Sequence, residues 1–254
     1  MRGRTVMRKS ILTVLLGLVM SGSLMAQDSN KTYAGLKLGL NMPRMYYTNQ
    51  NLKDLPHDFS IGPSFGLFAE FPLGKRLAVA AELNFQKRGG ATSYTYETDY
   101  KVKYDIQAMY VSLRIPFYWY LTKPSSLAPY LLLGPDAGYA FSGDISLSQP
   151  GLAISESNVS INNSNYNPYY LGVIAGVGAR YNIDFKGFIL VTKLDVVLNW
   201  GLLDTFSHSE HEGTSTPTNV NAYQHQGERY SRGVEVSLSL GFIRKHDMSA
   251  CRGF

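Results

Sequence analysis

The sequence contains little cysteine, and beyond residues 1–26 it has almost no excess of basic over acidic residues. Cys251 is the single cysteine, so neither an intrachain disulfide framework nor a cysteine-based metal site can form. Four of the 24 lysine and arginine residues fall within residues 1–26, which contain no acidic residue, so 20 basic residues remain against 19 acidic ones. A surface that binds nucleic acid needs a larger excess. These shortages exclude a disulfide scaffold and argue against nucleic acid as a partner.

The sequence also lacks an apolar run long enough to cross a membrane as a helix. The most apolar stretch, Ile11–Met20, falls short of the roughly 20 residues that a spanning helix needs. It follows a basic segment, residues 2–9, and precedes small residues that end at Ala26, which is the layout of a secretory signal peptide. Met7 is an alternative start. We therefore expect residues 1–26 to be a signal peptide, with export of the remaining chain.

In place of helical periodicity the sequence shows strict alternation of apolar and polar residues. In Gly233–Ile243, for example, Leu238 and Phe242 belong to an apolar face, whereas Glu235 and Ser239 belong to a polar one. Each alternating stretch is long enough for the about 9 to 11 residues of a tilted membrane strand. Eight such strands are predicted: Tyr33–Met42, Gly62–Phe71, Leu77–Arg88, Tyr104–Tyr120, Pro129–Phe141, Tyr169–Tyr181, Phe188–Trp200 and Gly233–Ile243.

The connections between these strands alternate between short and long. The short ones are 72–75, 122–127 and 182–187, and the long, mostly polar ones are 43–61, 89–103, 142–168 and 202–229. Short periplasmic turns and long external loops characterise outer-membrane barrels. The sequence therefore predicts an all-β fold, an eight-stranded antiparallel up-and-down transmembrane β-barrel over residues 27–243, followed by a tail, 244–254.

Several segments resemble the PorT-like outer-membrane β-barrel family of Bacteroidota-type bacteria. They are spread over essentially the whole mature chain: Gly35–Asn41, Ala81–Gly90, Tyr110–Pro116, Pro129–Pro135 and Asn199–Asp204. The resemblance implies an eight-stranded outer-membrane barrel without catalytic residues, and it implies a link to protein secretion, as for the founding member. The tail after Phe242 departs from the pattern, since such barrels often end at this closing aromatic residue.

The polar faces of the predicted strands carry charges of both signs. An eight-stranded barrel has just enough room inside for side chains, so we expect these charges to pair into a plug. A narrow ion or proton path is the functional alternative. The aromatic cluster Phe117–Tyr120 is interpreted as part of a membrane-interface girdle. The ten charged residues expected to face inward are Lys37, Glu70, Glu82, Arg88, Arg114, Asp136, Arg180, Lys193, Asp195 and Glu235.

The longest connection contains the densest set of candidate metal ligands. These are His208, Glu210, His211, Glu212 and, further along, His225. Two imidazoles and two carboxylates can hold Zn²⁺, but a metal site needs ligands oriented by a rigid frame, and this segment is predicted to be an irregular loop. We therefore expect a solvated loop, with no metal and no cofactor.

Two other classes of protein remain as alternatives. A barrel hydrolase needs a nucleophile and a rigidly held base; serines occur near the loops, at Ser142, Ser207, Ser209 and Ser231, but there is no Gly-x-Ser-x-Gly motif and no histidine within a predicted strand. A soluble lipocalin-type barrel places its apolar face inside. Here the charges and many glycines share one face, which favours a polar interior and a lipid-facing exterior.

The sequence thus predicts an integral protein of the cell outer membrane that is not an enzyme. Its expected role is structural or depends on interactions of its extracellular loops, with membrane lipid around it and protein partners bound by the loops or within a secretion complex. The alternatives are an accessory component of a protein-secretion system, of the PorT type, and a small channel.

Overall fold

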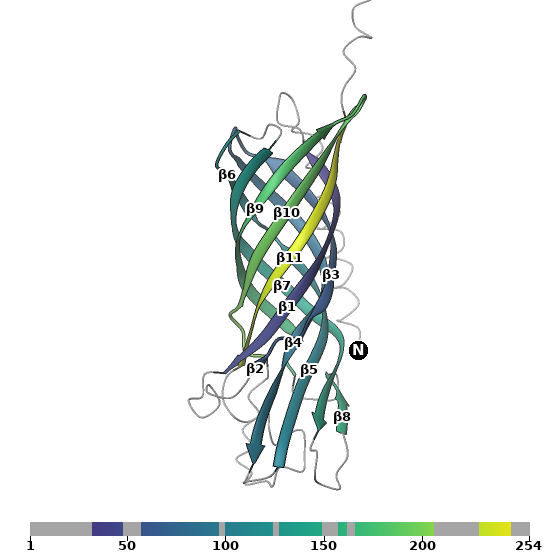
Figure 1. Ribbon diagram of the computed structural model, residues 1–254, viewed down its shortest axis with the longest axis vertical. Helices are drawn as coiled ribbons and strands as arrows, with labels where there is room; N and C mark the ends of the chain where they lie inside the picture. Colours follow the sequence, from purple (N-terminus) through teal and green to yellow (C-terminus); the bar gives the residue numbers. More distant parts are fainter. Residues whose placement is uncertain are drawn as a thin grey trace, which may run out of the picture.

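The computed structural model describes residues 32–47, 57–96, 100–123, 127–148, 157–161, 166–205 and 229–244. Within these ranges the chain folds into one antiparallel sheet (Figure 1). The strands are β1 (Tyr33–Tyr47), β2 (His57–Asp58), β3 (Gly62–Pro72), β4 (Leu77–Tyr96), β5 (Tyr100–Arg114), β6 (Phe117–Tyr120), β7 (Leu127–Ser148), β8 (Ser157–Ser160), β9 (Tyr169–Asp184), β10 (Phe188–Gly201) and β11 (Arg229–Arg244).

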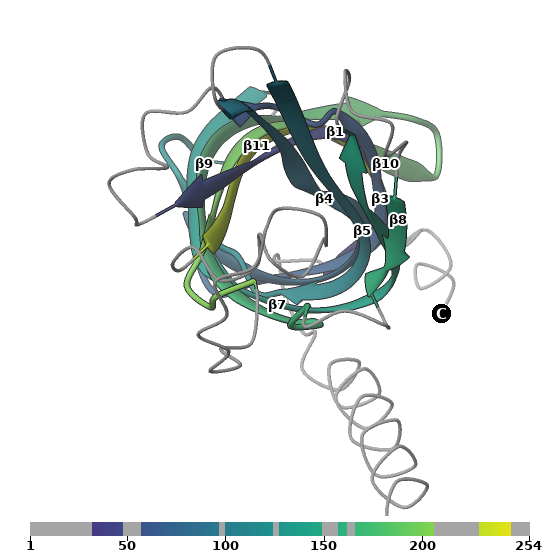
Figure 2. The same cartoon turned by 90° about the horizontal axis from the view of Figure 1, so that it is seen from below.

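The sheet closes into a barrel, which Figure 2 shows end-on. β1 pairs with β11, with Ala34 opposite Phe242, and the ring continues through β10, β9, β7, β5, β4 and β3 back to β1. β6 occupies the same place as β5, between β4 and β7. The two short strands, β2 and β8, pair with the ends of β4 and β7. The barrel therefore has eight strand positions, which confirms the predicted eight-stranded antiparallel fold.

The interruption between β5 and β6 has a local cause. Proline has no backbone N–H, so Pro116 cannot donate to a sheet ladder. The neighbouring bonds persist, since Ile115 N donates to Pro135 O at 3.1 Å and Ala80 N donates to Pro116 O at 2.9 Å. The predicted strand Tyr104–Tyr120 is thus one strand position built from two segments.

The two faces of the wall differ as the alternation predicts. On β1, Leu38 is 61% exposed on the outside, whereas its neighbour Lys37 is 3% exposed on the inside. Aliphatic side chains and Phe65 cover the middle of the outer face, while most other exposed aromatic side chains gather towards both ends. Those near the short turns are Phe117, Trp119, Tyr181, Phe188 and Phe242, and those near the long connections are Phe59, Tyr139, Phe141, Tyr169 and Trp200.

The strands extend further towards the long connections than predicted. The segment 89–103 was expected to be a loop, but β4 and β5 remain paired up to Tyr96 and Tyr100. The Gly89–Gly90 pair suggests the end of a strand, yet both glycines stay in the ladder, opposite Gln107 and Ile106. β4 and β5 therefore form a hairpin that projects beyond the barrel wall (Figure 1).

Parts of the prediction fall on residues that the structure does not describe. The predicted signal peptide, 1–26, and all but the first residue of the predicted tail, 244–254, are among them, as are parts of the long connections, above all 206–228. Among the described residues, no helix is long and apolar enough to cross a membrane.

Candidate functional site

The interior of the barrel, here called the lumen, contains all ten charged side chains that were expected to face inward. Each is at most 9% exposed. The group has five cations and five carboxylates, and every one of the eight strand positions contributes at least one of them. Burying an isolated charge costs far more than burying a paired one, so the arrangement of partners decides whether this interior is stable.

At the end of the lumen near the short turns, Glu70 on β3 is the common acceptor. Lys193 Nζ lies 2.8 Å from Glu70 Oε2, and Arg180 Nη1 lies 3.7 Å from Oε1. The Tyr120 hydroxyl donates to Oε1 at 2.7 Å. The Lys193 ammonium also lies 3.6 Å from the centre of the Tyr118 ring, a cation–π contact. One carboxylate thus receives donors from three strands.

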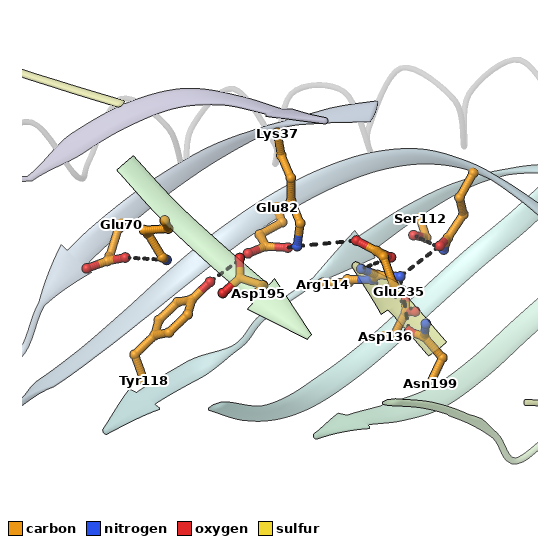
Figure 3. A network of polar contacts seen from close by, with 12 residues as sticks. Lys37, Glu70, Glu82, Ser112, Arg114, Tyr118, Asp136, Asp195, Asn199 and Glu235 are labelled. Atoms are coloured by element: carbon orange, nitrogen blue, oxygen red, sulfur yellow. Dashed lines mark hydrogen bonds and ion pairs between the residues drawn. The ribbon is translucent and has the colours of Figure 1, made fainter. Parts of the chain in front are cut away.

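In the middle of the lumen, Lys37 joins two carboxylates. Its Nζ lies 2.9 Å from Glu82 Oε2 and 3.5 Å from Glu235 Oε1. The Tyr118 hydroxyl donates to the other oxygen of Glu82 at 2.7 Å. Figure 3 shows this group between the Glu70 cluster and Arg114, so the polar contacts follow one another along the lumen.

Arg114 on β5 makes the largest set of contacts (Figure 3). Its guanidinium donates to Glu235 at 2.8 Å, to Gln86 at 2.7 Å, to Asn199 at 3.1 Å and to Asp136 at 3.2 Å. The planar fork of arginine suits this role, because its donors point in fixed, different directions. Four other strands, β4, β7, β10 and β11, are therefore tied to β5 through one side chain.

Arg88 extends the contacts towards the long connections. Its Nη2 lies 2.5 Å from Asp136 Oδ2, and its Cζ lies 3.5 Å from the centre of the Tyr170 ring. The hydroxyls of Tyr110 and Tyr166 share a hydrogen bond of 2.6 Å. Every one of the five cations thus has a carboxylate within 3.7 Å.

The sequence interpretation missed the tyrosines of this network. The cluster Phe117–Tyr120 was expected to belong to the girdle as a whole, but only Phe117 and Trp119 face outward. Tyr118 and Tyr120 are buried and bond to Glu82 and Glu70. The alternation within these four residues was the available signal, because successive strand residues point to opposite faces.

Tyr130 is a further tyrosine of the lumen, and its position depends on a glycine. Its hydroxyl donates to Asp195 Oδ1. A Cβ at Gly178 would lie 2.6 Å from both this oxygen and the Tyr130 ring. Gly178 therefore leaves the room in which Tyr130 reaches Asp195, which accounts for one of the glycines that share the inner face with the charges.

Apolar side chains close the lumen beside the polar network. Tyr33, Phe68, Val191 and Ile243 form a buried cluster near the short turns, where the Tyr33 and Phe68 rings meet edge to face at 5.8 Å between centroids. Towards the long connections, Met45, Ile106, Ile145 and Ile161 are buried. Charged groups and apolar caps together fill the interior, as expected for eight strands.

The other sequence candidates lie outside the lumen network or outside the described residues. His208, Glu210, His211, Glu212, His225, Ser207 and Ser209 lie outside the described residues. Within the described ranges there is no group of three or more histidine, cysteine or acidic residues placed to hold a metal. Ser142 is exposed on β7, and Ser231 is buried on β11, opposite Met45.

Solved barrel structures resemble this chain. Ail, the attachment invasion locus protein of Yersinia pestis, is 11% identical, with 83% of this chain and 99% of that chain covered and a TM-score of 0.34. OprG of Pseudomonas aeruginosa is 9% identical, covering 85% and 96%, with a TM-score of 0.43. Neisserial surface protein A is 12% identical, covering 84% and 99%, with a TM-score of 0.35. These scores are low, so the fold rests on the strand pairing described above.

A comparison with curated proteins finds no match. A family model, by contrast, matches residues 25–207, which is more than half of the chain. It describes an outer membrane protein β-barrel domain, in agreement with the closed ring, the apolar outer face and the aromatic ends. The chain therefore belongs to the family of outer membrane protein β-barrel domains.

Proposed function

We propose that this outer-membrane barrel is a non-enzymatic binding protein. It acts through the surface at the end of the barrel that carries the long connections. The filled lumen carries this proposal. An interior with five paired cations and five carboxylates, covered by apolar side chains, offers no passage to a solute. The barrel can therefore act by binding a partner at the ends of its strands.

A small channel is the alternative that the lumen argues against. An ion crossing the barrel has to displace Arg114 from Glu235 and Lys37 from Glu82, and both pairs are fully buried. Removing one partner of such a pair costs about 3 to 5 kcal/mol. A conducting ion would have to separate such pairs each time it passes, so the lumen argues against a channel.

The projecting β4–β5 hairpin is the best candidate for the binding surface. From Ala91 opposite Asp105 to Tyr96 opposite Tyr100 the two strands pair with each other. β2 pairs with Ala91 and Thr92, and β7 pairs with Lys103, Tyr104 and Asp105, so among the described residues the outer edges are unpaired over 93–96 and 100–102. Unpaired strand edges readily accept another chain. A protein that adds a strand to this hairpin is the kind of partner that fits.

The PorT-like resemblance suggests a more specific role, that of an accessory component of a protein-secretion system. The barrel then serves as a membrane anchor and the hairpin as the contact with other subunits. Loss of secreted proteins from the medium, in cells that lack this chain but keep other outer-membrane barrels, is the result expected for that role.

The test removes the hairpin and leaves the barrel. Residues 92–104 are replaced by Asn-Gly, which joins the paired residues Ala91 and Asp105 by a two-residue turn. Intact cells are treated with a membrane-impermeable crosslinker, and crosslinked proteins are identified after purification. We expect a partner with the unchanged protein and none with the shortened one, which should still show heat-modifiable gel mobility.

The matched control changes the other end of the barrel. Lys75→Ser with Arg76→Ser alters an exposed short turn without touching the lumen, and it should leave the crosslinked partner unchanged. Retention of the partner by the shortened protein, or its loss in the control, would contradict the assignment to the hairpin. A single-channel conductance without any partner would contradict the binding role itself.

A further inference from the structure

Two arginines lie side by side on the outer face of the barrel, where β1 meets β11. Arg44 on β1 is directly opposite Arg232 on β11, and Arg232 is directly opposite Trp200 on β10. All three side chains belong to the outward-facing set of their strands. Like charges directly opposite each other in a sheet repel, so this arrangement needs an explanation.

The described residues offer the two arginines no counter-ion. Each of the five cations in the lumen has a carboxylate, but no ion pair links either Arg44 or Arg232 to a described carboxylate. Instead the guanidinium carbon of Arg232 lies 3.9 Å from the centre of the Tyr46 ring and 4.5 Å from that of Trp200. That of Arg44 lies 5.5 Å from the centre of the Phe59 ring. The rings hold the guanidiniums in place without neutralising them.

The position of the pair relative to the apolar band identifies the environment. The next outward row towards the middle of the barrel is Leu198, Val234 and Met42, and the row after it is Val196, Val236 and Leu40. The arginines thus occupy the first row beyond the lipid-facing surface. Trp200 and Phe59, both about half exposed, mark the level of the lipid headgroups.

We propose that Arg44 and Arg232 bind the phosphate group of an anionic membrane lipid. Two adjacent guanidiniums present several donors to a tetrahedral group of oxygens, for which arginine is well suited. The phosphate removes the repulsion between them, and the acyl chains of the same lipid lie along Leu198, Val234 and Met42. Because the pair faces outward, the ligand comes from the bilayer, and this inference does not depend on the proposed protein partner.

The test uses Trp200 as a local reporter. The sequence has two tryptophans, so Trp119→Phe leaves Trp200 alone. This protein is reconstituted in dioleoylphosphatidylcholine vesicles that contain a minor fraction of brominated lipid, either phosphatidylglycerol or phosphatidylcholine. A bound anionic lipid brings bromine against Trp200, so brominated phosphatidylglycerol should quench its fluorescence far more strongly than its share of the bilayer predicts.

The expected preference for the anionic quencher is roughly fivefold for each arginine, from the attraction of one basic residue to an anionic lipid surface. Arg44→Gln should reduce it about fivefold although β11 lies between the strands of Arg44 and Trp200, and Arg44→Gln with Arg232→Gln should abolish it. Arg44→Lys should retain most of it. Arg76→Gln, at the opposite end, should change nothing. Heat-modifiable mobility confirms that each variant is folded.

Three results would overturn the proposal. Equal quenching by the two brominated lipids would show that there is no selective site, and an unchanged preference in the double variant would place the site elsewhere. Inorganic phosphate at constant ionic strength is the third arm. It should leave the quenching unchanged, and a marked fall would show that the pair takes a soluble phosphate in place of a lipid.

Discussion

Arg114 makes hydrogen bonds to side chains from four other strands through a single guanidinium group. Its partners include two carboxylates, Glu235 and Asp136, that are themselves fully buried. Replacing one partner of a buried ion pair leaves the other charged and without compensation, which is more costly than never having buried the pair. We therefore expect Arg114 to contribute more to the free energy of unfolding than the other members of the network.

Arg114→Met should lower the free energy of unfolding by about 3 to 5 kcal/mol. The measurement is urea unfolding in lipid vesicles, followed by tryptophan fluorescence. Arg76→Met, on an exposed turn, is the matched control and should have little effect. Adding Glu235→Gln to Arg114→Met should cost less than the sum of the two single changes. Additive losses would mean that the two residues do not interact.

The two faces of β11 provide a second prediction at the scale of single residues. Leu238 is 43% exposed towards lipid, whereas its neighbour Ser239 is 3% exposed and faces the lumen. Leu238→Arg should cost about 2 to 4 kcal/mol, because it places a charge in the apolar band. Ser239→Arg should act through crowding of the lumen instead. Unfolding in vesicles measures both, and tolerance of Leu238→Arg equal to that of Leu238→Val would place this face in water.

At the scale of elements, the hairpins depend on a few backbone conformations that favour glycine. Gly89 on β4 has a φ of 142°, and a Cβ there would lie 1.8 Å from Ile106 O on β5. Gly187, in the short turn before β10, has a φ of 126° but open space around it. The first glycine is thus required by both conformation and contact, and the second by conformation alone.

Gly187→Ala should therefore destabilise the barrel by about 1 to 3 kcal/mol, and Gly89→Ala should destabilise it by more. Gly74→Ala, at a turn glycine with ordinary φ and nothing within 4 Å, is the neutral control. The urea midpoint gives the order of the three variants. A smaller effect for Gly89 than for Gly187 would show that β4 and β5 can move apart at little cost.

For the whole molecule, the filled lumen predicts electrical silence. Purified protein in planar bilayers should show no stable conductance, because paired side chains from all eight strand positions occupy the interior. Arg114→Ala with Glu235→Ala removes both members of a fully buried ion pair, and its conductance is compared with that of the unchanged protein. A reproducible single-channel conductance from the unchanged protein would refute the plug.

Much of the barrel could be predicted from the sequence because one period governs every strand. Alternation separates Leu238 from Ser239 and Lys37 from Leu38 without any knowledge of their neighbours. The same rule placed the ten lumen charges correctly. The choice of partners could not be predicted, since Arg114 meets Glu235 only after the ring closes and brings together distant parts of the chain.

The errors also have physical reasons. The projecting parts of β4 and β5 lie beyond the apolar band, so lipid no longer imposes an alternating pattern on them, and Gly89–Gly90 resembles a break. Tyr118 and Tyr120 were placed with Trp119 by composition, although their positions in the alternation assign them to the lumen. In both cases the composition of a segment obscured the position that each residue takes in the paired strands.

The pairing of β1 with β11 has a consequence for biogenesis. Because β1 and β11, the first and last strands of the described residues, pair with each other, the ring cannot close until β11 has been synthesised and delivered. Before β11 arrives, β1 and β10 each expose an open edge, and Lys37 and Arg114 lack Glu235. Contacts so far apart in sequence form slowly. The unfinished chain must therefore be kept from aggregating during export, and β11 becomes the strand whose arrival completes assembly.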